Sequence, residues 1–177
     1  MQNIIIDQPY RFVPPKAGRF WPMLLCFVLP SYLNKSHGIE SHELLGVDRL
    51  KASVEAGHGI MLTPNHCRPC DPMVVGLLSE QIGRPLNVIA SWHLFMQNRL
   101  LTWILPRMGA FSIYREGMDR EALKRAIQIL SEARRPLVLF PEGVITRTND
   151  SLNHLMEGTA VIAPTAAKQR VGLKPAG

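Results

Sequence analysis

The chain has 177 residues, 46% of them apolar and 19% charged, with a formal net charge of +6 at pH 7. This length is typical of one domain with its own core, and the composition excludes a disordered chain. The positive charge favours phosphate-bearing ligands or an anionic membrane surface, whereas the scattered lysines and arginines, without interleaved aromatic residues, argue against a nucleic-acid partner.

Residues 1–40 are predicted to form a leader and an apolar helical segment. The first 18 residues contain three prolines, should be irregular and do not resemble a signal peptide. The apolar stretch Phe20–Leu33 contains two prolines and is shorter than the roughly 20 residues that cross a bilayer. Two interpretations stay open: a buried helix, or a helix in the membrane interface with Trp21 and Tyr32 at headgroup level.

Residues 41–177 are predicted to form an α/β domain with a mainly parallel sheet flanked by helices, because short apolar strands alternate with helical segments. The expected elements, in chain order, are a short strand at 42–47, a helix at 48–56, a strand in "GIMLTPNH", a helix at 72–83, a strand in "LNVIAS", a helix from 93 to about 106, a strand in "AFSIYRE", a helix at 119–135, a strand in "PLVLFPEG" and a helix at 152–168. Ligands of such domains bind at the carboxyl ends of the strands.

The first of these strand ends carries "NHCRPCD", which includes His66 and Asp71. If the loop folds back, the carboxylate meets the imidazole, and an imidazole held in this way takes a proton from an alcohol near neutral pH. In the alternative interpretation Asp71 only caps the helix that begins at Pro72. A further alternative is a metal or redox site at Cys67 and Cys70. Structural zinc, however, needs four ligands, and these two cysteines supply only two of them. Redox cysteines lie at the start of a helix, whereas the helix expected here begins after both cysteines.

Two further strand ends carry charged residues. Arg115 follows "AFSIY", and a planar guanidinium there suits a phosphate. Glu142 and Gly143 end the strand "LVLF", and Arg147 follows in the loop. Each of these patterns, taken by itself, also fits an ordinary solvated turn.

The three blocks "NHCRPCD", "GAFSIYR" and "FPEG", in this order, resemble the motifs of the glycerophospholipid acyltransferases over roughly residues 57–168. The resemblance implies a glycerol-3-phosphate acyltransferase-like fold and an O-acyltransferase of phospholipid biosynthesis. Such an enzyme moves a fatty acyl group from acyl-CoA or acyl-carrier protein to the hydroxyl of a lysophospholipid or glycerol phosphate. No metal or other cofactor is implied, and the expected location is peripheral or interfacial, at the cytoplasmic face of a membrane.

The resemblance also implies roles for individual residues. His66 is the general base, and Asp71 holds its imidazole. Asn65 or backbone N–H groups are the candidates for stabilising the oxyanion. The residues implied to shape the site for the phosphate of the acceptor are Arg115, Glu142 and Gly143, with Arg147 matching the second arginine of some relatives.

Two departures from the family pattern affect these expectations. Ile145 stands where the lysophosphatidate enzymes usually carry an arginine, which leaves the acceptor open. The family also has a fourth block, an apolar strand bearing a proline, which "VGLKPAG" at 171–177 matches poorly. We therefore expect a C-terminally truncated domain, and a catalytically inactive, membrane-associated remnant stays an alternative to the enzyme.

Overall fold

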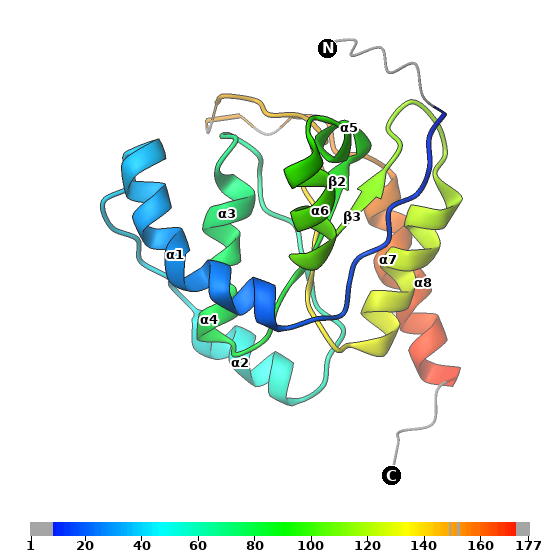
Figure 1. Cartoon of the computed structure of the whole chain (residues 1–177). Coiled ribbons are helices and arrows are strands. Elements are labelled where there is room, and N and C mark those ends of the chain that lie inside the picture. Colours follow the sequence, from blue (N-terminus) through cyan, green and yellow to red (C-terminus); the bar gives the residue numbers. More distant parts are fainter. Residues whose placement is uncertain (1–8, 149, 152, 173–177) are drawn as a thin grey trace.

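The computed structural model describes residues 9–148, 150–151 and 153–172 of the chain (Figure 1). Its elements, in chain order, are α1 (Phe20–His37), α2 (Val47–Glu55), β1 (Met61–Leu62), α3 (Asp71–Gly76), α4 (Leu78–Gln81), β2 (Asn87–Ser91), α5 (Trp92–Met96), α6 (Arg99–Arg107), β3 (Ala110–Ile113), α7 (Arg120–Glu132), β4 (Leu137–Val138) and α8 (Gly158–Gly172).

The four strands form one sheet in the order β1-β4-β2-β3, and every neighbouring pair is parallel. The last strand along the chain thus lies between the first and the second, with Leu137 opposite both Met61 and Asn87. The predicted parallel α/β architecture is confirmed. Because all strands run the same way, their carboxyl ends and the loops that follow them meet at one edge of the sheet.

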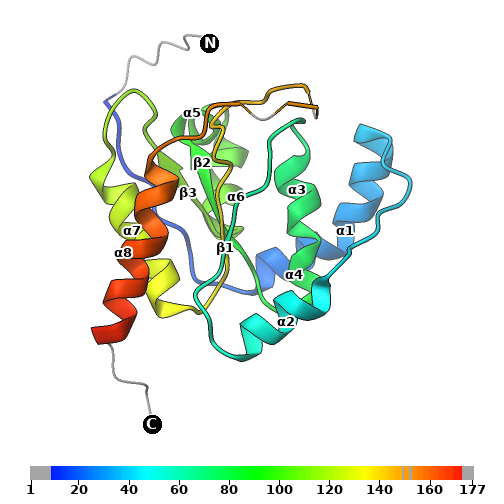
Figure 2. The same cartoon turned by 180° about the vertical axis from the view of Figure 1, so that it is seen from behind.

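Helices cover both faces of the sheet, as the two opposite views show (Figures 1 and 2). On one face α7 and α8 pack together, and Phe111, Leu137 and Ile162 belong to the core between them and the strands. On the other face α2, α3 and α4 approach the sheet, where Val54 and Val138 share a second cluster. The core therefore lies on both sides of the central strand β4, which makes its two residues inaccessible to solvent.

Helix α7 follows its sequence pattern closely. The side chain of Asp119 accepts a hydrogen bond from the backbone N–H of Ala122 at 3.0 Å and so caps the N-terminus of the helix. The buried residues of this helix include Ala126, Ile127 and Leu130, which recur at helical spacing and form its apolar face. The helix ends where Ala133 adopts a left-handed conformation with φ 51°.

Four predicted elements differ from the structure. The helix expected at 152–168 begins only at Gly158 and continues to Gly172. The strand expected at 42–47 is wrong, because Gly46 is in the left-handed conformation and leads directly into α2. The helix expected at 72–83 is divided into α3 and α4, although Gly83 ends it as predicted. The helix expected from 93 to 106 is divided into α5 and α6, because the side chain of Asn98 accepts from Leu101 N at 2.8 Å and begins a new helix.

The apolar segment near the N-terminus forms one helix, α1, which continues to His37 with Pro30 inside it. Its inner side buries Leu29 and Leu33 against α3, whereas Phe20 and Phe27 on the other side are 67% and 87% exposed. Within the described parts of the chain, none of the helices combines the length and the apolar character needed to cross a membrane. Helix α8 includes residues 171–172, and the rest of the expected fourth block lies outside the described residues.

Candidate active site

The loops that follow β1, β3 and β4 lie together at the carboxyl edge of the sheet, at the top of Figure 1. The first and the third of them are joined directly, because the backbone N–H of Thr146 donates to the carbonyl oxygen of His66 at 2.8 Å. The hydroxyl of Thr146 donates to the same oxygen at 3.2 Å. This contact follows from the strand order, since β1 and β4 are neighbours in the sheet.

The side chains of His66 and Asp71 are in contact, with Nδ1 of the imidazole 3.1 Å from Oδ2 of the carboxylate. They are 15% and 21% exposed, so both are shielded but accessible from the loop edge. Asp71 is the first residue of α3, and its Oδ2 also accepts from the backbone N–H of Arg68 at 2.7 Å. The carboxylate therefore points toward the loop and does not cap α3, which is the role that its position in the sequence suggested.

The imidazole of His66 is held from a second side by the ring of Phe140, whose centroid is 4.3 Å away at an interplanar angle of 31°. With Nδ1 directed at Asp71, the opposite ring nitrogen, Nε2, faces away from the carboxylate. A carboxylate at Nδ1 selects the tautomer with Nε2 unprotonated and stabilises the cation formed when Nε2 takes a proton. An imidazole and a carboxylate in this arrangement can act chemically as a general base and its orienting group.

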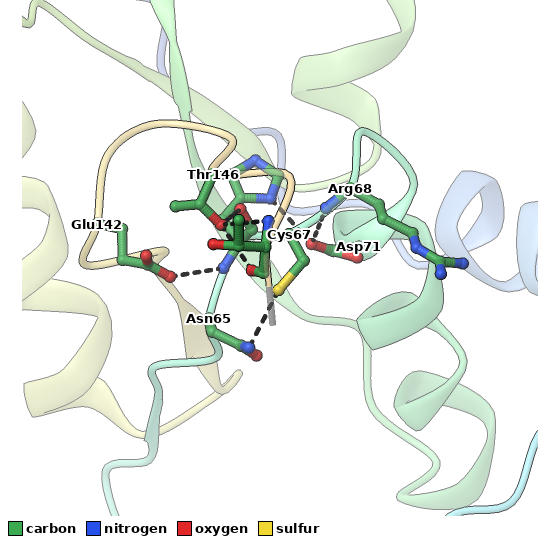
Figure 3. Close-up of polar contacts among 8 residues, drawn as sticks. Asn65, Cys67, Arg68, Asp71, Glu142 and Thr146 are labelled. Carbon is green, nitrogen blue, oxygen red and sulfur yellow. Dashed lines mark hydrogen bonds and ion pairs between the residues drawn. The ribbon is translucent and has the colours of Figure 1, made fainter. Parts of the chain in front are cut away.

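Glu142 holds the backbone of the histidine loop. Its Oε1 accepts from the backbone N–H of His66 at 2.9 Å, and its Oε2 accepts from the side-chain amide of Asn153 at 3.1 Å. The side chain is 6% exposed. Figure 3 shows Glu142 and Asp71 approaching the segment between Asn65 and Arg68 from opposite sides. The hydrogen bond from the backbone of His66, followed by that from Asn153, keeps the pKa of Glu142 below its ordinary value of 4.5.

The lowered pKa of Glu142 predicts a pH-dependent contribution to stability. A carboxylate with a lowered pKa in the folded state stabilises the protein above its unfolded-state pKa, and this stabilisation is lost as the pH falls through the folded-state pKa. Glu142→Gln should therefore unfold at a lower urea concentration than the wild type at pH 7, and the difference should shrink below pH 4.5. Urea unfolding across this range measures it.

Glu157→Gln is the matched control for this experiment, because the same chemical change is made on an exposed side chain near the same loop. It should not alter the unfolding midpoint at pH 7. A difference between Glu142→Gln and the wild type that stays constant from pH 7 down to pH 3 would contradict the proposed role of the Glu142 carboxylate.

Arg115 and Gly143 lie close together although they follow different strands. A guanidinium nitrogen of Arg115 is 3.9 Å from the place that a Cβ would occupy at Gly143. Gly143 has φ +63°, and a Cβ there would also lie 2.6 Å from the sulfur of Met156. The residue is thus glycine because of its conformation and the close packing of its own loop. Arg115 is exposed, so its guanidinium faces solvent beside this turn.

The remaining predicted site residues are at the surface of the same loops. Asn65 is exposed, and its side-chain amide donates to the sulfur of Cys67 at 3.2 Å. Arg147 is exposed and has φ 59°, an uncommon conformation for a residue with a side chain. It directly follows Thr146, which binds the carbonyl of His66, so the loop that bears Arg147 is anchored to the histidine.

The two cysteines of the first block have separate environments. Cys70 is 3% exposed and packs with Leu29, Leu33 and Leu77 between α1 and the helix that follows the loop. Cys67 is partly exposed, and both thiols are free. Among the described residues, no group of three or more His, Cys, Asp or Glu side chains is arranged to hold a metal ion. These residues give the metal-site interpretation no support.

Two residues contribute to the site without having been identified in the sequence, Phe140 and Asn153. Thr146 was expected in the sequence as a possible anion ligand beside Arg147, and in the structure it binds the carbonyl oxygen of His66. Phe140 belongs to the third block, so its proximity to the histidine was the easiest to anticipate. The contacts of Thr146 and Asn153 depend on how the loop after β4 folds back over the loop after β1. A polar residue in a long loop carries no local signal of such a partner.

Comparisons with known proteins agree with this geometry. The sequence model of the family described as Acyltransferase matches residues 46–172. A similar protein is the 1-acyl-sn-glycerol-3-phosphate acyltransferase of Streptococcus pneumoniae (strain ATCC BAA-255 / R6), which is 34% identical over 74 residues. That alignment covers 42% of this chain and 26% of the pneumococcal protein, so the chain matches about a quarter of its relative's length. The matched range includes all three sequence blocks and the helices on both faces of the sheet. The chain therefore belongs to the Acyltransferase family.

Proposed function

We propose that the chain is an O-acyltransferase that moves a fatty acyl group from acyl-CoA or acyl-carrier protein to the hydroxyl of a lysophospholipid or glycerol phosphate. The observation that carries the proposal is the contact of 3.1 Å between His66 Nδ1 and Asp71 Oδ2 at the carboxyl edge of the sheet. Family membership and the similarity to a 1-acyl-sn-glycerol-3-phosphate acyltransferase support it.

In the proposed reaction, Nε2 of His66 takes the proton of the acceptor hydroxyl while the oxygen attacks the thioester carbon. A tetrahedral intermediate forms, its C–S bond breaks, and the departing thiolate takes the proton back from the imidazolium. Asp71 stabilises the imidazolium between these two steps. The backbone N–H of His66 donates to Glu142, which leaves the side-chain amide of Asn65 or another N–H group as the donor to the oxyanion.

We assign recognition of the acceptor's phosphate to Arg115 and Arg147. Arg115 is exposed beside the turn at Gly143, and a guanidinium binds phosphate oxygens through two parallel hydrogen bonds. Glu142, which the family resemblance connected with the phosphate, instead has both oxygens engaged by protein N–H groups. Its proposed role is to hold the histidine loop against the loop that bears Arg147.

We also propose that the enzyme works as a peripheral protein on an anionic membrane surface, the cytoplasmic leaflet of a bilayer. The exposed side of α1 supports this, because apolar residues recur there at helical spacing: Phe20, Leu24, Phe27, Val28 and Tyr32. Trp21 packs edge-on against Trp103, which is itself 41% exposed and lies under the guanidinium of Arg107. The net charge of +6 adds attraction to anionic lipids.

Replacing Phe20 and Phe27 together by serine should weaken binding to phosphatidylglycerol vesicles by roughly tenfold or more, because each exposed ring buries apolar surface in the interface. Cosedimentation measures this binding. Val171→Ser, an equally exposed apolar residue on α8, is the control and should bind as the wild type does. Equal binding by the phenylalanine variant, or equal binding of the wild type to vesicles of phosphatidylcholine alone, would contradict the membrane proposal.

The experiment that tests the enzymatic proposal is an acceptor screen with the wild-type chain. Long-chain acyl-CoA is the donor, glycerol 3-phosphate and a series of lysophospholipids are the acceptors, and release of free thiol is the readout. A parallel series replaces acyl-CoA by acyl-carrier protein. Acceptor-dependent thiol release supports the proposal and names the acceptor. Thiol release that no acceptor stimulates, with either donor, contradicts it and favours the inactive remnant.

A further inference from the structure

Residues 9–19, the described part of the N-terminal segment, run along the outer edge of the sheet before α1 begins. β3 is an edge strand, and Val13 exchanges hydrogen bonds with Ser112 on it: Ser112 N donates to Val13 O at 3.1 Å, and Val13 N donates to Ser112 Oγ at 2.8 Å. Lys16 N donates to Pro106 O at 2.8 Å further along. In Figure 1 this dark blue segment begins beside the loop after β3 and descends along the strand. The N-terminal segment therefore covers the open edge of β3.

Tyr10 is the residue of this segment that reaches the loop after β3. Its hydroxyl donates to the carboxylate of Asp119, and because that proton is used, the hydroxyl of Ser112 is the donor in the 3.2 Å contact with the Tyr10 oxygen. The ring stacks on Tyr114 at 5.1 Å and meets Trp92 edge-on at 5.4 Å. Burial, together with the bond to Asp119, raises the pKa of Tyr10, so the hydroxyl stays protonated and remains a donor at neutral pH.

Asp119 closes the loop that Tyr10 touches. One carboxylate oxygen accepts from the backbone N–H of Tyr114 at 3.0 Å, and the other caps α7 at Ala122 N, also at 3.0 Å. The carboxylate of Asp119 thus holds the chain on both sides of residues 115–118, at Tyr114 and at the start of α7. Arg115 is the first residue of this span, and its guanidinium extends toward Gly143 in the neighbouring loop.

We propose that Tyr10 is a positioning residue for phosphate recognition: by its bond to Asp119 and its stacking on Tyr114, it fixes the loop from which Arg115 reaches the acceptor. This inference rests on the proposed function of Arg115. Tyr10 lies outside residues 46–172, the range that the family's sequence model matches. The specificity of the site is thus completed by a segment beyond the matched acyltransferase range.

The test uses Tyr10→Phe, which keeps both ring contacts and removes only the hydroxyl. With short-chain acyl-CoA and glycerol 3-phosphate or a short-chain lysophosphatidate, the KM for the acceptor should rise by roughly three- to tenfold. This is less than the direct loss of a hydrogen bond to a charged group would cause, because Tyr10 acts on the acceptor only through Arg115. The kcat and the KM for acyl-CoA should change less than about twofold, since His66 and Asp71 are held by other contacts. Ser41→Ala, which removes a hydroxyl from an exposed residue outside the site, is the control.

Two further measurements separate positioning from general stability. In the background Arg115→Gln, Tyr10→Phe should cause no additional rise in the acceptor KM, because its effect passes through that arginine. Hydrogen exchange should become faster at the amides of residues 114–119 in Tyr10→Phe, and glycerol 3-phosphate should protect these amides in the wild type more than in the variant.

The outcomes distinguish the inference from the function on which it rests. A wild-type chain that transfers no acyl group contradicts the proposed function, whereas unchanged exchange and unchanged protection at 114–119 in Tyr10→Phe contradict the inference whatever the activity assay gives. An unchanged acceptor KM, or a rise that persists undiminished in the Arg115→Gln background, also overturns it. Faster exchange with reduced protection supports it even without turnover.

Discussion

Replacing His66 with alanine should lower acyl transfer by roughly 10²- to 10⁴-fold, the loss that follows removal of a general base. The imidazole contacts Asp71 and the ring of Phe140, while the loop itself is held through the backbone of His66 by Glu142 and Thr146. Because these backbone bonds do not need the imidazole, the variant should keep its fold. Thiol release from acyl-CoA with the acceptor found in the screen measures the effect.

The control for this experiment is His42→Ala, since His42 is an exposed histidine that precedes the matched range. It should transfer acyl groups at the wild-type rate. Circular dichroism and the urea midpoint of His66→Ala establish that the protein is folded. Transfer by His66→Ala within tenfold of the wild type would show that another group removes the proton from the acceptor.

Gly109→Ala should destabilise the protein by about 3 kcal/mol or more, because the new methyl group has no room and the backbone conformation is strained. Gly109 has φ +90°, and a Cβ there would lie 2.5 Å from the carbonyl oxygen of Leu86 and 3.3 Å from the side-chain nitrogen of Asn87. That buried asparagine donates to Gly109 O at 2.9 Å, and Val88 N donates to the same oxygen at 3.2 Å. The glycine of the second block is thus needed where β2 and β3 begin.

Gly83→Ala is the matched control for the urea unfolding of Gly109→Ala. Gly83 has φ +63°, but nothing lies within 4 Å of an added Cβ, so this variant carries the conformational strain without the collision. It should lose only about 1 kcal/mol. If the two variants lost the same stability, the close approach to Leu86 would not be the reason for glycine at position 109.

The elements of the fold were predictable where the signal is local. The strand β2 comes from the apolar run "LNVIAS", and α7 from an apolar stripe behind the capping residue Asp119. The order of the strands was not predictable, since an apolar pair such as Leu137 and Val138 does not indicate which neighbours it will have. The break between α5 and α6 at Asn98 was predictable in principle, because asparagine is a good N-cap. The apolar pattern, however, continues through this position.

The contacts of the candidate site also differ in how far the sequence alone predicts them. His66 and Asp71 are five positions apart, so a single turn of the loop brings them together and the sequence alone indicates the contact. Glu142 is 76 positions from His66, and its bond to that backbone depends on β4 lying beside β1. The bond from Tyr10 to Asp119 spans 109 positions and depends on the N-terminal segment following the edge of β3. Contacts of this kind require the tertiary structure.

The insertion of β4 between β1 and β2 also sets the order in which the protein can fold. The β2 and β3 strands can pair early, but β1 pairs with β4, whose residues leave the ribosome much later. Closing so large a loop costs chain entropy before it gains sheet hydrogen bonds, which makes such parallel pairings slow. Refolding should therefore show protection of the amides in β2 and β3 before that of the histidine loop. The loop that bears His66 is then fixed in the last step, when residues 137–142 join the sheet.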